Sequence, residues 1–502
     1  MNDNTENNKE NQSSPLKQEP KTIFDGNENL TPEELPAEEE LQVEEVSSDV
    51  ASAEDAVAGH EVIDAGHPFL LNENNRMKFL FIGGGALGVL ILFFLIFQLF
   101  FGAKKAPKII TLTYWGLWED RQIMEPLINE YQVKNPTIKI NYEKMSPQSY
   151  REKLIARGRN GQGPDIFRFH NTWLPEIQEV VTPLPSSIMS NQEFEKTFYP
   201  IYTKDLKVQD HYYGIPLEMD MLVLAYNENL FKKAGILTAP ANWDEVMEDV
   251  GKLSIKDSDN KLITSGIALG TATNIQHFSE VLGLMLLQNG GNLKKLDTPE
   301  AAQALEIYRK FAEAPTDYWN DTMPDSITAF AQEKVAMTIV PLWEVLTIKA
   351  MNPDIKVKVA SVPNVPGSKS ISLASYWVEG VSRFSANQLE AWKFLKYLST
   401  KDAEMKRFEA QSKVRLFGQA YSRVDLGSML SSNEYLNVIA SQLDSVYSLP
   451  LSARTFDNGL NDEIITYLEN AVTSTTQGVS YSEAMKTAGQ GISSVFSKFK
   501  IE

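Results

Sequence analysis

Aromatic and acidic side chains occur together where predicted strands end. Trp115 and Trp118 follow the first predicted strand, with Glu119 beside them, and Asp220 interrupts the apolar run PLEMDMLVLAYN. Flat aromatic surfaces can cover the C–H face of a sugar ring, and carboxylates or amides can hydrogen-bond its hydroxyls. A lone carboxylate in an apolar run costs free energy unless it is paired or faces water. Trp118, Glu119 and Asp220 are therefore candidates for a ligand-binding cleft, whereas core packing is an equally open interpretation of Trp115.

Residues that would indicate catalysis or metal binding are sparse. The chain has no cysteine, which excludes disulfides, thiolate metal sites and cysteine catalysis. No second histidine or carboxylate stands at ligand spacing near His170, so a surface or hydrogen-bonded role suits it better than a metal site. A glycosidase would need two carboxylates, and Glu119, Asp165 and Asp220 can be considered. Asp165 in GPDIF has the position of a structural residue at a strand start, and the sequence has no nucleophile elbow, metal-ligand cluster or phosphate-binding loop. We therefore predict no enzyme activity, cofactor or metal.

A long apolar segment lies at 77–102. It contains Gly83, Gly85 and Gly88 at the G-x-G-x-x-G spacing of a dinucleotide-binding turn, but residues 79–102 carry no charge at all. A nucleotide site would need an amphipathic helix after the turn, and a secretory signal has a shorter apolar region. About 20 apolar residues span a bilayer as a helix. We therefore predict a transmembrane helix at 77–102.

Acidity is concentrated before this segment. Residues 1–76 hold 19 acidic and 4 basic side chains, which is −15 of the net charge of −19 and leaves −4 for the rest. Such a composition buries too little apolar surface to offset the entropy of ordering the chain, so we predict a disordered acidic tail over 1–75. No basic patch interleaved with aromatics occurs, which argues against nucleic-acid binding.

Strands and helices alternate along the remaining chain. KIITLTYWG, TIKINYEKM and PDIFRFH have the pattern of strands, separated by helical segments around 120–136 and 149–161. Asn242 and Glu245 form a helix-start signal, and Pro299 stands in the first turn of another helix. This alternation predicts an α/β fold with largely parallel sheets over 107–502.

The chain resembles the extracellular sugar-binding proteins of ABC importers, the solute-binding family of maltose and multiple-sugar type. The motifs that carry the resemblance span about 108–502 in the family's order: YWG, LINEYQVKNPTIKINY, YREKLIARGRNGQGPDIF, YGIPLEMDMLVLAYNENLFKKAGI, NWDEVMEDVGKL, LLQNGGNL, SITAFAQEKVAMTIVPLW and AWKFLKYLST. The resemblance implies a two-lobed, type II periplasmic-binding-protein-like fold with a hinge. Lobe 1 would comprise about 108–217 and 380–435, and lobe 2 about 218–379 and 436–502, with crossings near Leu217–Glu218 and Glu379–Gly380.

The resemblance also implies where ligand contacts lie. The family often presents polar and aromatic sugar contacts at the position of RFHNTW, an acidic contact at that of Asp220 and a stacking aromatic at that of Trp343, for which core packing stays an alternative. Glu218 is a less favoured neighbour of Asp220, and His277 in TNIQHF is a weaker candidate. The candidate ligand-binding residues are Trp115, Trp118, Glu119, Phe169, Asn171, Trp173, Asp220, Asn274, Trp343, Tyr376, Trp377 and Arg454.

The implied function is a membrane-anchored, extracellular binding protein that delivers a sugar, oligosaccharide or other small solute to ABC permease subunits. The family usually has a cleaved signal peptide, often with a lipid-bearing cysteine, and here the helix at 77–102 would take the place of that lipid. Flanking Lys and Arg residues weakly favour a cytoplasmic C-terminal part, but a solute-binding domain works outside, so we expect the tail inside. A ligand-binding sensor or surface glycan-binding protein not coupled to transport is the alternative.

Overall fold

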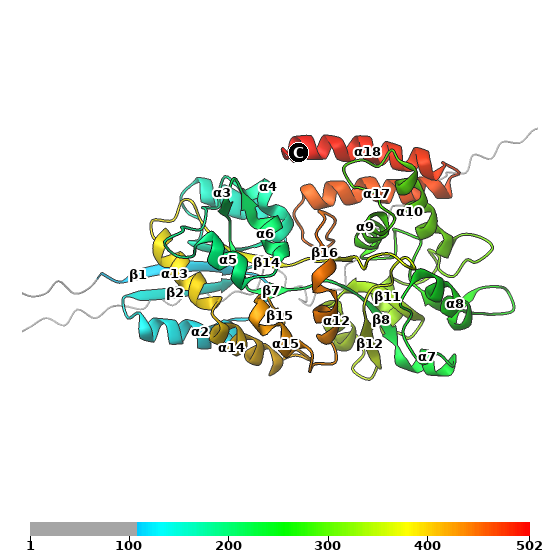
Figure 1. Cartoon of the computed structure of the whole chain (residues 1–502), viewed down its shortest axis with the longest axis horizontal. Helices are drawn as coiled ribbons and strands as arrows, with labels where there is room; N and C mark the ends of the chain where they lie inside the picture. Colours follow the sequence, from blue (N-terminus) through cyan, green and yellow to red (C-terminus); the bar gives the residue numbers. More distant parts are fainter. Residues whose placement is uncertain (1–107, 502) are drawn as a thin grey trace, which may run out of the picture. The chain divides into compact units, whose positions relative to one another are not determined.

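Two five-stranded sheets organise the part of the chain that the computed structural model describes, residues 108–501 (Figure 1). The predicted acidic tail and the predicted transmembrane helix at 77–102 lie outside the described residues. Within 108–501, no helix combines the length and the apolar character needed to cross a bilayer.

The first sheet, in the first lobe, has the strand order β2-β1-β3-β14-β6. Its strands are β1 (Ile110–Gly116), β2 (Ile138–Lys144), β3 (Ile166–His170), β6 (Ile215–Pro216) and β14 (Trp377–Val381). Every residue of β3 is buried, whereas β2 alternates between buried and exposed residues. A central strand in an α/β sheet is covered on both faces, so the two polar residues of β3 must find partners inside the protein.

Helices surround this sheet. They are α2 (Arg121–Lys134), α3 (Tyr150–Arg159), α4 (Leu174–Ile177), α5 (Asn191–Thr197), α6 (Pro200–Leu206), α13 (Gln388–Leu398), α14 (Lys401–Ser412) and α15 (Gly427–Leu430), with 3-10 turns η1 (Asn171–Trp173) and η3 (Val424–Leu426). Short strands β4 (Lys207–Val208) and β5 (His211–Tyr212) form a hairpin, and β7 (Glu218–Met219) pairs with β15 (Ala420–Tyr421). Segments far apart in sequence thus build one lobe.

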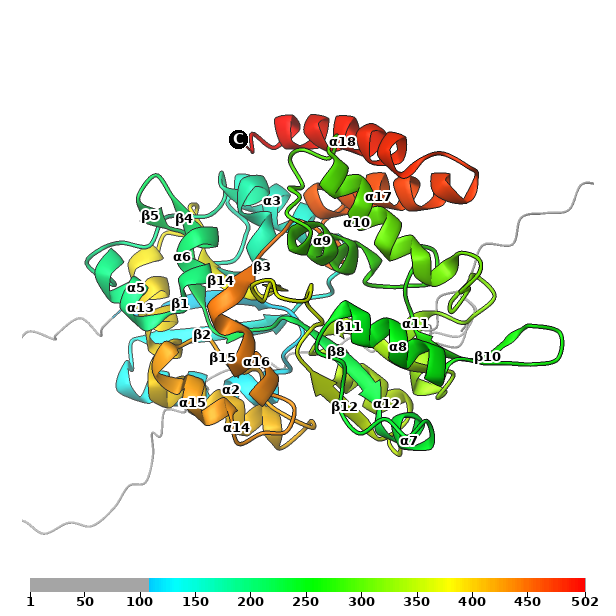
Figure 2. The same cartoon turned by 45° about the vertical axis from the view of Figure 1, so that its right-hand side comes forward.

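The second sheet has the order β12-β8-β11-β10-β9. Its strands are β8 (Leu222–Asn227), β9 (Ile255–Lys256), β10 (Leu262–Ile267), β11 (Val335–Pro341) and β12 (Val357–Ala360). Its helices are α7 (Glu228–Lys233), α8 (Trp243–Leu253), α9 (Phe278–Gln288), α10 (Pro299–Arg309), α11 (Ser326–Ala331), α12 (Glu344–Met351) and the short turn η2 (Lys310–Ala312). The C-terminal helices α17 (Leu460–Thr476) and α18 (Tyr481–Lys498) lie against α9 and α10 (Figure 2).

Strand direction differs from the largely parallel sheets that the sequence predicts. In the second sheet β8 pairs antiparallel with both β11 and β12, and only the β10–β11 pair there is parallel. In the first sheet β14 is antiparallel to β3 and β6. The cause is connectivity: β8 and β14 are the strands that enter a sheet from the other lobe, so they run opposite to strands reached through helical crossovers.

Local helix signals are confirmed. The side chain of Asn242 accepts a hydrogen bond from the Glu245 backbone N–H (3.0 Å) and donates one to the Glu245 carboxylate (2.8 Å). Pro299 begins α10 after the N-cap residue Thr298. Asp165 has the expected structural role, because its carboxylate accepts hydrogen bonds from Thr113 on β1 and from Ser385 beyond β14.

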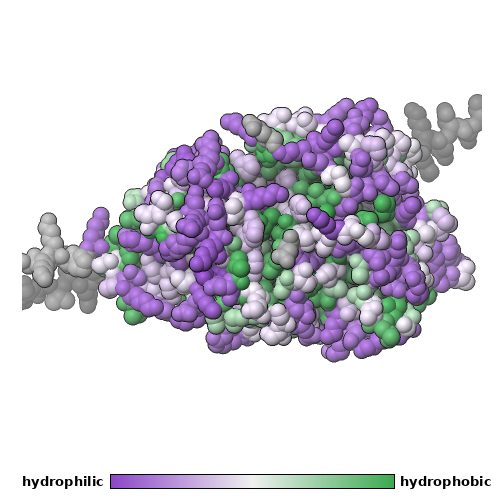
Figure 3. All heavy atoms as spheres, in the orientation of Figure 1, coloured by the Kyte–Doolittle hydropathy of each residue, from purple (hydrophilic) through white to green (hydrophobic). Residues whose placement is uncertain are grey.

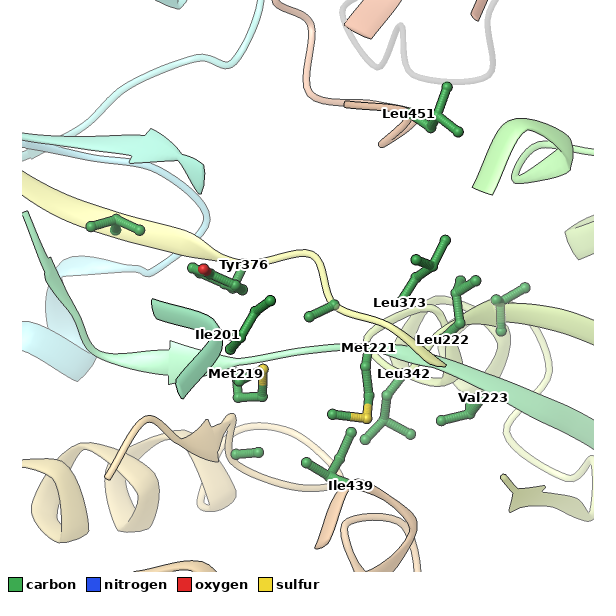
Figure 4. Packing of buried hydrophobic residues seen from close by; sticks show 14 of the residues in the cluster. Ile201, Met219, Met221, Leu222, Val223, Leu342, Leu373, Tyr376, Ile439 and Leu451 are labelled. Carbon is green, nitrogen blue, oxygen red and sulfur yellow. The ribbon is translucent and has the colours of Figure 1, made fainter. Parts of the chain in front are cut away.

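Three hinge segments, 219–222, 373–376 and 446–450, lie side by side where the chain passes between the lobes. Met221 bridges Ala374, Ala374 N–H donates to the Tyr447 carbonyl (2.7 Å), and β13 (Ser372–Leu373) pairs with β16 (Val446–Tyr447). Hydrophobic side chains gather along the middle of the face shown in Figure 3. Figure 4 shows apolar side chains along these segments, with Ile439 of α16 (Asn437–Gln442) on one side and Leu451 on the other.

The second crossing lies earlier than the resemblance implies. Glu379 and Gly380 are inside β14, paired with Arg168 and Phe167 of β3, and β14 already begins at Trp377 opposite His170. The chain therefore changes lobes at 373–376, and residues 377–379, which we expected in lobe 2, belong to the first sheet. At the first crossing, β7 carries Glu218 and Met219 on the first-lobe side before β8 begins at Leu222.

Arg168 of β3 joins the first lobe internally. Its guanidinium contacts Glu379 of β14 (Nε to Oε1, 2.7 Å) and Glu218 of β7 (Nη2 to Oε2, 3.1 Å), and Glu218 also contacts Arg407 of α14 (3.1 Å). All four side chains are buried. Burial would raise the pKa of Glu218, but the charges of Arg168 and Arg407 outweigh it and hold that pKa below its usual range.

We expect Arg168→Met to lower the free energy of unfolding by about 3–5 kcal/mol, because it leaves the Glu379 carboxylate buried without its ion partner. Urea denaturation followed by circular dichroism measures the change. Lys413→Ala is the control, since its pair with Glu409 is exposed on both sides and should contribute at most about 1 kcal/mol. Equal losses in the two variants would contradict a structural role for the buried pair.

Candidate ligand-binding site

A cavity of about 200 Å³ lies where the two lobes meet beside the hinge segments. Both lobes contribute to its wall, and so does the loop before α17. The lining residues are Trp118, Arg168, His170, Glu218, Asp220, Trp343, Leu346, Thr347, Ser375, Tyr376, Trp377, Arg415, Gln419, Ala453, Arg454 and Thr455. The cavity thus combines aromatic rings with hydroxyl, carboxyl and guanidinium groups.

Three tryptophans, Trp118, Trp343 and Trp377, line the cavity together with the rings of Tyr376 and His170. Trp118 and Trp377 meet edge to face with ring centres 5.7 Å apart, and Trp377 is held in turn by Trp173 behind it (5.3 Å). Trp118 is 40% exposed, and its backbone is left-handed at φ 66°. A bulky residue rarely adopts that conformation, and such strain is concentrated at functional positions. Trp343 supplies the ring from the second lobe.

Asp220 holds Trp343 in place. Its two carboxylate oxygens accept hydrogen bonds from the backbone N–H groups of Leu342 (2.9 Å) and Trp343 (3.1 Å), directly before α12. Burial raises the pKa of Asp220 to about 8, although these backbone donors act in the opposite direction. The carboxyl therefore positions the aromatic residue and also lines the cavity.

Arg454 lies over Trp343. Its guanidinium carbon is 5.5 Å from the ring centre, and its Nη1 is 3.3 Å from Glu344 Oε1. Glu344 is fully buried and also contacts His277, whose other ring nitrogen is 3.0 Å from Glu280. Burial alone would lower the pKa of His277, but the two carboxylates raise it to about 9. This chain of charges fixes the second-lobe side of the cavity.

A closed ring of hydrogen bonds fixes the hinge side. His170 Nδ1 lies 2.8 Å from Thr172 Oγ1 and Nε2 lies 3.0 Å from Ser375 Oγ, which contacts Ser452 Oγ at 3.2 Å. Asn461 completes the ring through Ser452 N–H (3.1 Å) and Thr172 Oγ1 (2.7 Å). Burial lowers the pKa of His170 to about 3, so its imidazole is neutral. Because Thr172 N–H donates to Nδ1, the proton belongs on Nε2, facing Ser375.

The structure brings six of the twelve candidate residues to the cavity: Trp118, Asp220, Trp343, Tyr376, Trp377 and Arg454. The other six do not line it. Trp115, Phe169 and Trp173 are buried in the core. Glu119 is buried and contacts Gln411 and Arg415. Asn274 donates a hydrogen bond to the Asn320 carbonyl and accepts one from the Trp319 indole N–H. Asn171 donates to Asp205 and lines a separate groove of about 700 Å³ beside the C-terminal residues.

Tertiary contacts explain these differences. Phe169 faces the core because β3 is covered on both sides, and Trp173, in the turn η1 that follows, is buried in the same core. Of the three carboxylates considered for a glycosidase, Asp220 alone lines the cavity. Sequence reasoning did not select Arg168, Leu346, Thr347, Ser375, Arg415, Gln419, Ala453 and Thr455 as ligand contacts. Arg168 had a detectable signal, a lone charge within a buried strand, but nothing local marks Arg415 or Gln419.

Two α/β lobes joined by three hinge segments around an aromatic-lined cavity define a protein that encloses a solute. Residues 116–405, more than half of the chain, match the family described as bacterial extracellular solute-binding protein. The chain belongs to this family, which confirms the resemblance seen in its motifs.

Individual relatives are distant in sequence. A binding protein of Brucella abortus (strain 2308) is 27% identical over 288 residues, covering 55% of this chain and 68% of that protein. The multiple sugar-binding protein of Streptococcus mutans is 22% identical, covering 60% and 73%. Among solved structures, an ABC transporter solute-binding protein from Thermotoga lettingae bound with α-D-tagatose aligns with a TM-score of 0.60 and 25% identity, over 77% of this chain and 99% of that one.

A buried carboxyl at the lobe contact is a source of pH dependence. Glu176 of α4 accepts hydrogen bonds from Arg151 (2.7 Å) and from the Leu460 N–H at the start of α17 (3.0 Å). Burial, with the nearby Asp457 charge, raises the pKa of Glu176 to about 8 despite Arg151. Ionised Glu176 is therefore less favourable in the folded chain than in the unfolded chain.

We expect the free energy of unfolding to fall as pH rises from 5 to 9. A group whose pKa is higher in the folded chain stabilises the fold fully at pH values below its pKa in the unfolded chain. This stabilisation is lost as the pH rises through the pKa in the folded chain, which is about 8 for Glu176 and about 9 for His277. Urea titrations at several pH values measure the fall. Glu176→Gln should reduce the slope between pH 5 and 8, by a few kcal/mol in total at about 1.4 kcal/mol per pKa unit. An unchanged slope in this variant would contradict the assignment.

Proposed function

We propose that this chain is the membrane-tethered, extracellular substrate-binding subunit of an ABC importer, that it binds a carbohydrate in the cavity between its lobes, and that it delivers this ligand to a permease. The observation that carries the proposal is the arrangement of Trp118, Trp377 and Trp343, from two lobes, around one cavity. Aromatic rings match the apolar C–H faces of a sugar, and their burial against it supplies about 25 cal/mol per Å².

Polar groups of the wall suit hydroxyls. The Thr455 hydroxyl is buried at the cavity and has no hydrogen-bond partner among the described residues. Buried hydroxyls are nearly always paired, so a ligand hydroxyl is a suitable partner for it. Gln419 and Thr347 line the same space with further amide and hydroxyl groups.

Charge compensation in the wall favours a neutral ligand. Arg168 forms ion pairs with Glu218 and Glu379, and Glu218 is also paired with Arg407. Arg415 is paired with Glu119, and Arg454 with Glu344. Burial shifts the remaining carboxyl, Asp220, toward its neutral form. An ionised ligand would lose its hydration without gaining an unpaired counter-charge, which is costly.

Relatives support the carbohydrate class. One is named a multiple sugar-binding protein, and the Thermotoga lettingae structure holds a ketohexose, α-D-tagatose. Transport would need no bond to be made or broken in this chain. Ligand would drive closure through its higher affinity for the closed arrangement of the lobes, which the permease then recognises.

We expect Trp118→Ala to weaken binding of a cognate sugar about 30-fold, since loss of roughly 80 Å² of stacking area at 25 cal/mol per Å² is about 2 kcal/mol. A thermal-shift screen of neutral mono- and oligosaccharides identifies the sugar, because a ligand of the folded state raises the melting temperature. Isothermal titration then measures affinity.

The matched control is Phe384→Ala, an aromatic of similar exposure (44%) on the first lobe that does not line the cavity. It should leave affinity unchanged. Absence of any melting-temperature shift across the panel, with folded protein, would count against carbohydrate binding. Equal weakening by both variants would place the sugar elsewhere.

Membrane anchoring is part of the proposal and rests on the uncharged segment 79–102. We expect protease added to intact cells to digest the 107–502 domain and to leave the acidic tail protected. Antibodies against each part, with lysed cells as control, report the outcome. Protection of the domain on intact cells would overturn the proposed orientation.

A further inference from the structure

The aromatic cavity beside the hinge segments is small. At about 200 Å³ it lies below the roughly 300–1,000 Å³ of pockets that enclose drug-sized ligands. Its opposite walls belong to different lobes, with Trp118 and Arg415 on the first and Leu346 and Thr347 on the second. Closure around a ligand brings these walls together, so it cannot enlarge the space. A chain of three or more sugar rings would have to extend past the rim.

Arg454 stands at this rim on the second-lobe side. Its side chain is 39% exposed, whereas its partner Glu344 is fully buried. The guanidinium lies over Trp343, 5.5 Å from the ring centre, and covers part of the surface on which a further sugar ring would stack. A longer ligand could reach that surface only if Arg454 moved away.

Several contacts oppose such a movement. Glu344, which holds the guanidinium, is itself fixed by His277 at 3.2 Å. The backbone on either side is also tied, because Ala453 N–H donates to Glu280 (2.7 Å) and Thr455 is buried. Arg454 has a left-handed backbone, with φ 61°, so its position is set by these surroundings and not by local preference.

We infer that the cavity takes a mono- or disaccharide and that Arg454 sets this limit by closing the Trp343 end. This inference rests on the proposed carbohydrate function. Arg454 is thus a residue that determines ligand length, in addition to any hydrogen bond that its free guanidinium edge donates to the sugar.

A series of glucose, maltose, maltotriose and maltotetraose, run beside tagatose, mannobiose and mannotriose, tests the limit on the full-length chain by thermal shift and titration calorimetry. We expect a mono- or disaccharide to bind at least 10-fold more tightly than the trimer or tetramer of the same sugar. Tighter binding of the trimer or tetramer would overturn the size limit and leave the carbohydrate function intact. No binding by any sugar, with folded protein, would overturn the carbohydrate function and the limit together.

Arg454→Ala should then improve binding of the trimer at least 10-fold relative to the monomer. Arg454→Gly is a second variant that accepts the left-handed backbone without strain, in case the alanine variant folds poorly. Arg157→Ala is the matched control: Arg157 also lies over a tryptophan, Trp115 (5.6 Å), but outside the cavity. Equal weakening of all lengths in the Arg454 variants would show a simple ligand contact and overturn the length-setting role.

Discussion

Hydrogen bonding among the three hinge segments is the constraint on which the binding site depends. The bridge between Met221 and Ala374, and the bond from Ala374 to Tyr447, hold the segments as neighbouring strands. Residues just beyond these bonds, Asp220 and Trp377, then enter the cavity from fixed positions. Backbone polar groups at a lobe junction must be paired if they are buried, so this pairing also makes a stable crossing possible. A shift in one segment would displace cavity residues from both lobes.

Buried charge is the second organising feature. Arg168, within a fully buried strand, would be prohibitively costly without Glu218 and Glu379, and the three groups tie β3, β7 and β14 into one unit. A similar logic applies to Glu344, His277 and Arg454 on the other side of the cavity. These networks give the wall many polar groups but little net charge, which supports the proposal of an uncharged, hydroxyl-rich ligand.

Local patterns predicted much of the architecture. Buried β-branched runs and one alternating segment located the first three strands, the Asn242 and Glu245 pair marked a helix start, and Asp165 was placed at a strand start. The structure confirms each of these predictions. Each of these depends on neighbours within a few residues, or on a strand whose burial is visible in its composition. The direction of the strands, by contrast, could not be predicted from local patterns. The antiparallel pairing of β8 and β14 depends on the lobe from which the chain arrives, and no local pattern records that.

Some residues of the candidate site could likewise be predicted from the sequence, and others depended on tertiary packing. Residue type, strand-end position and the family resemblance together predicted Trp118, Asp220, Trp343 and Trp377 as ligand contacts, and the structure places all four around one cavity. Which strand-end residues face the cavity and which face the core was settled by packing: Phe169 and Trp173 turned inward, whereas Arg415 and Gln419 arrived from a distant segment. Residue chemistry can be read along the chain, but the direction of a side chain and its distant neighbours exist only once both lobes are folded against the hinge.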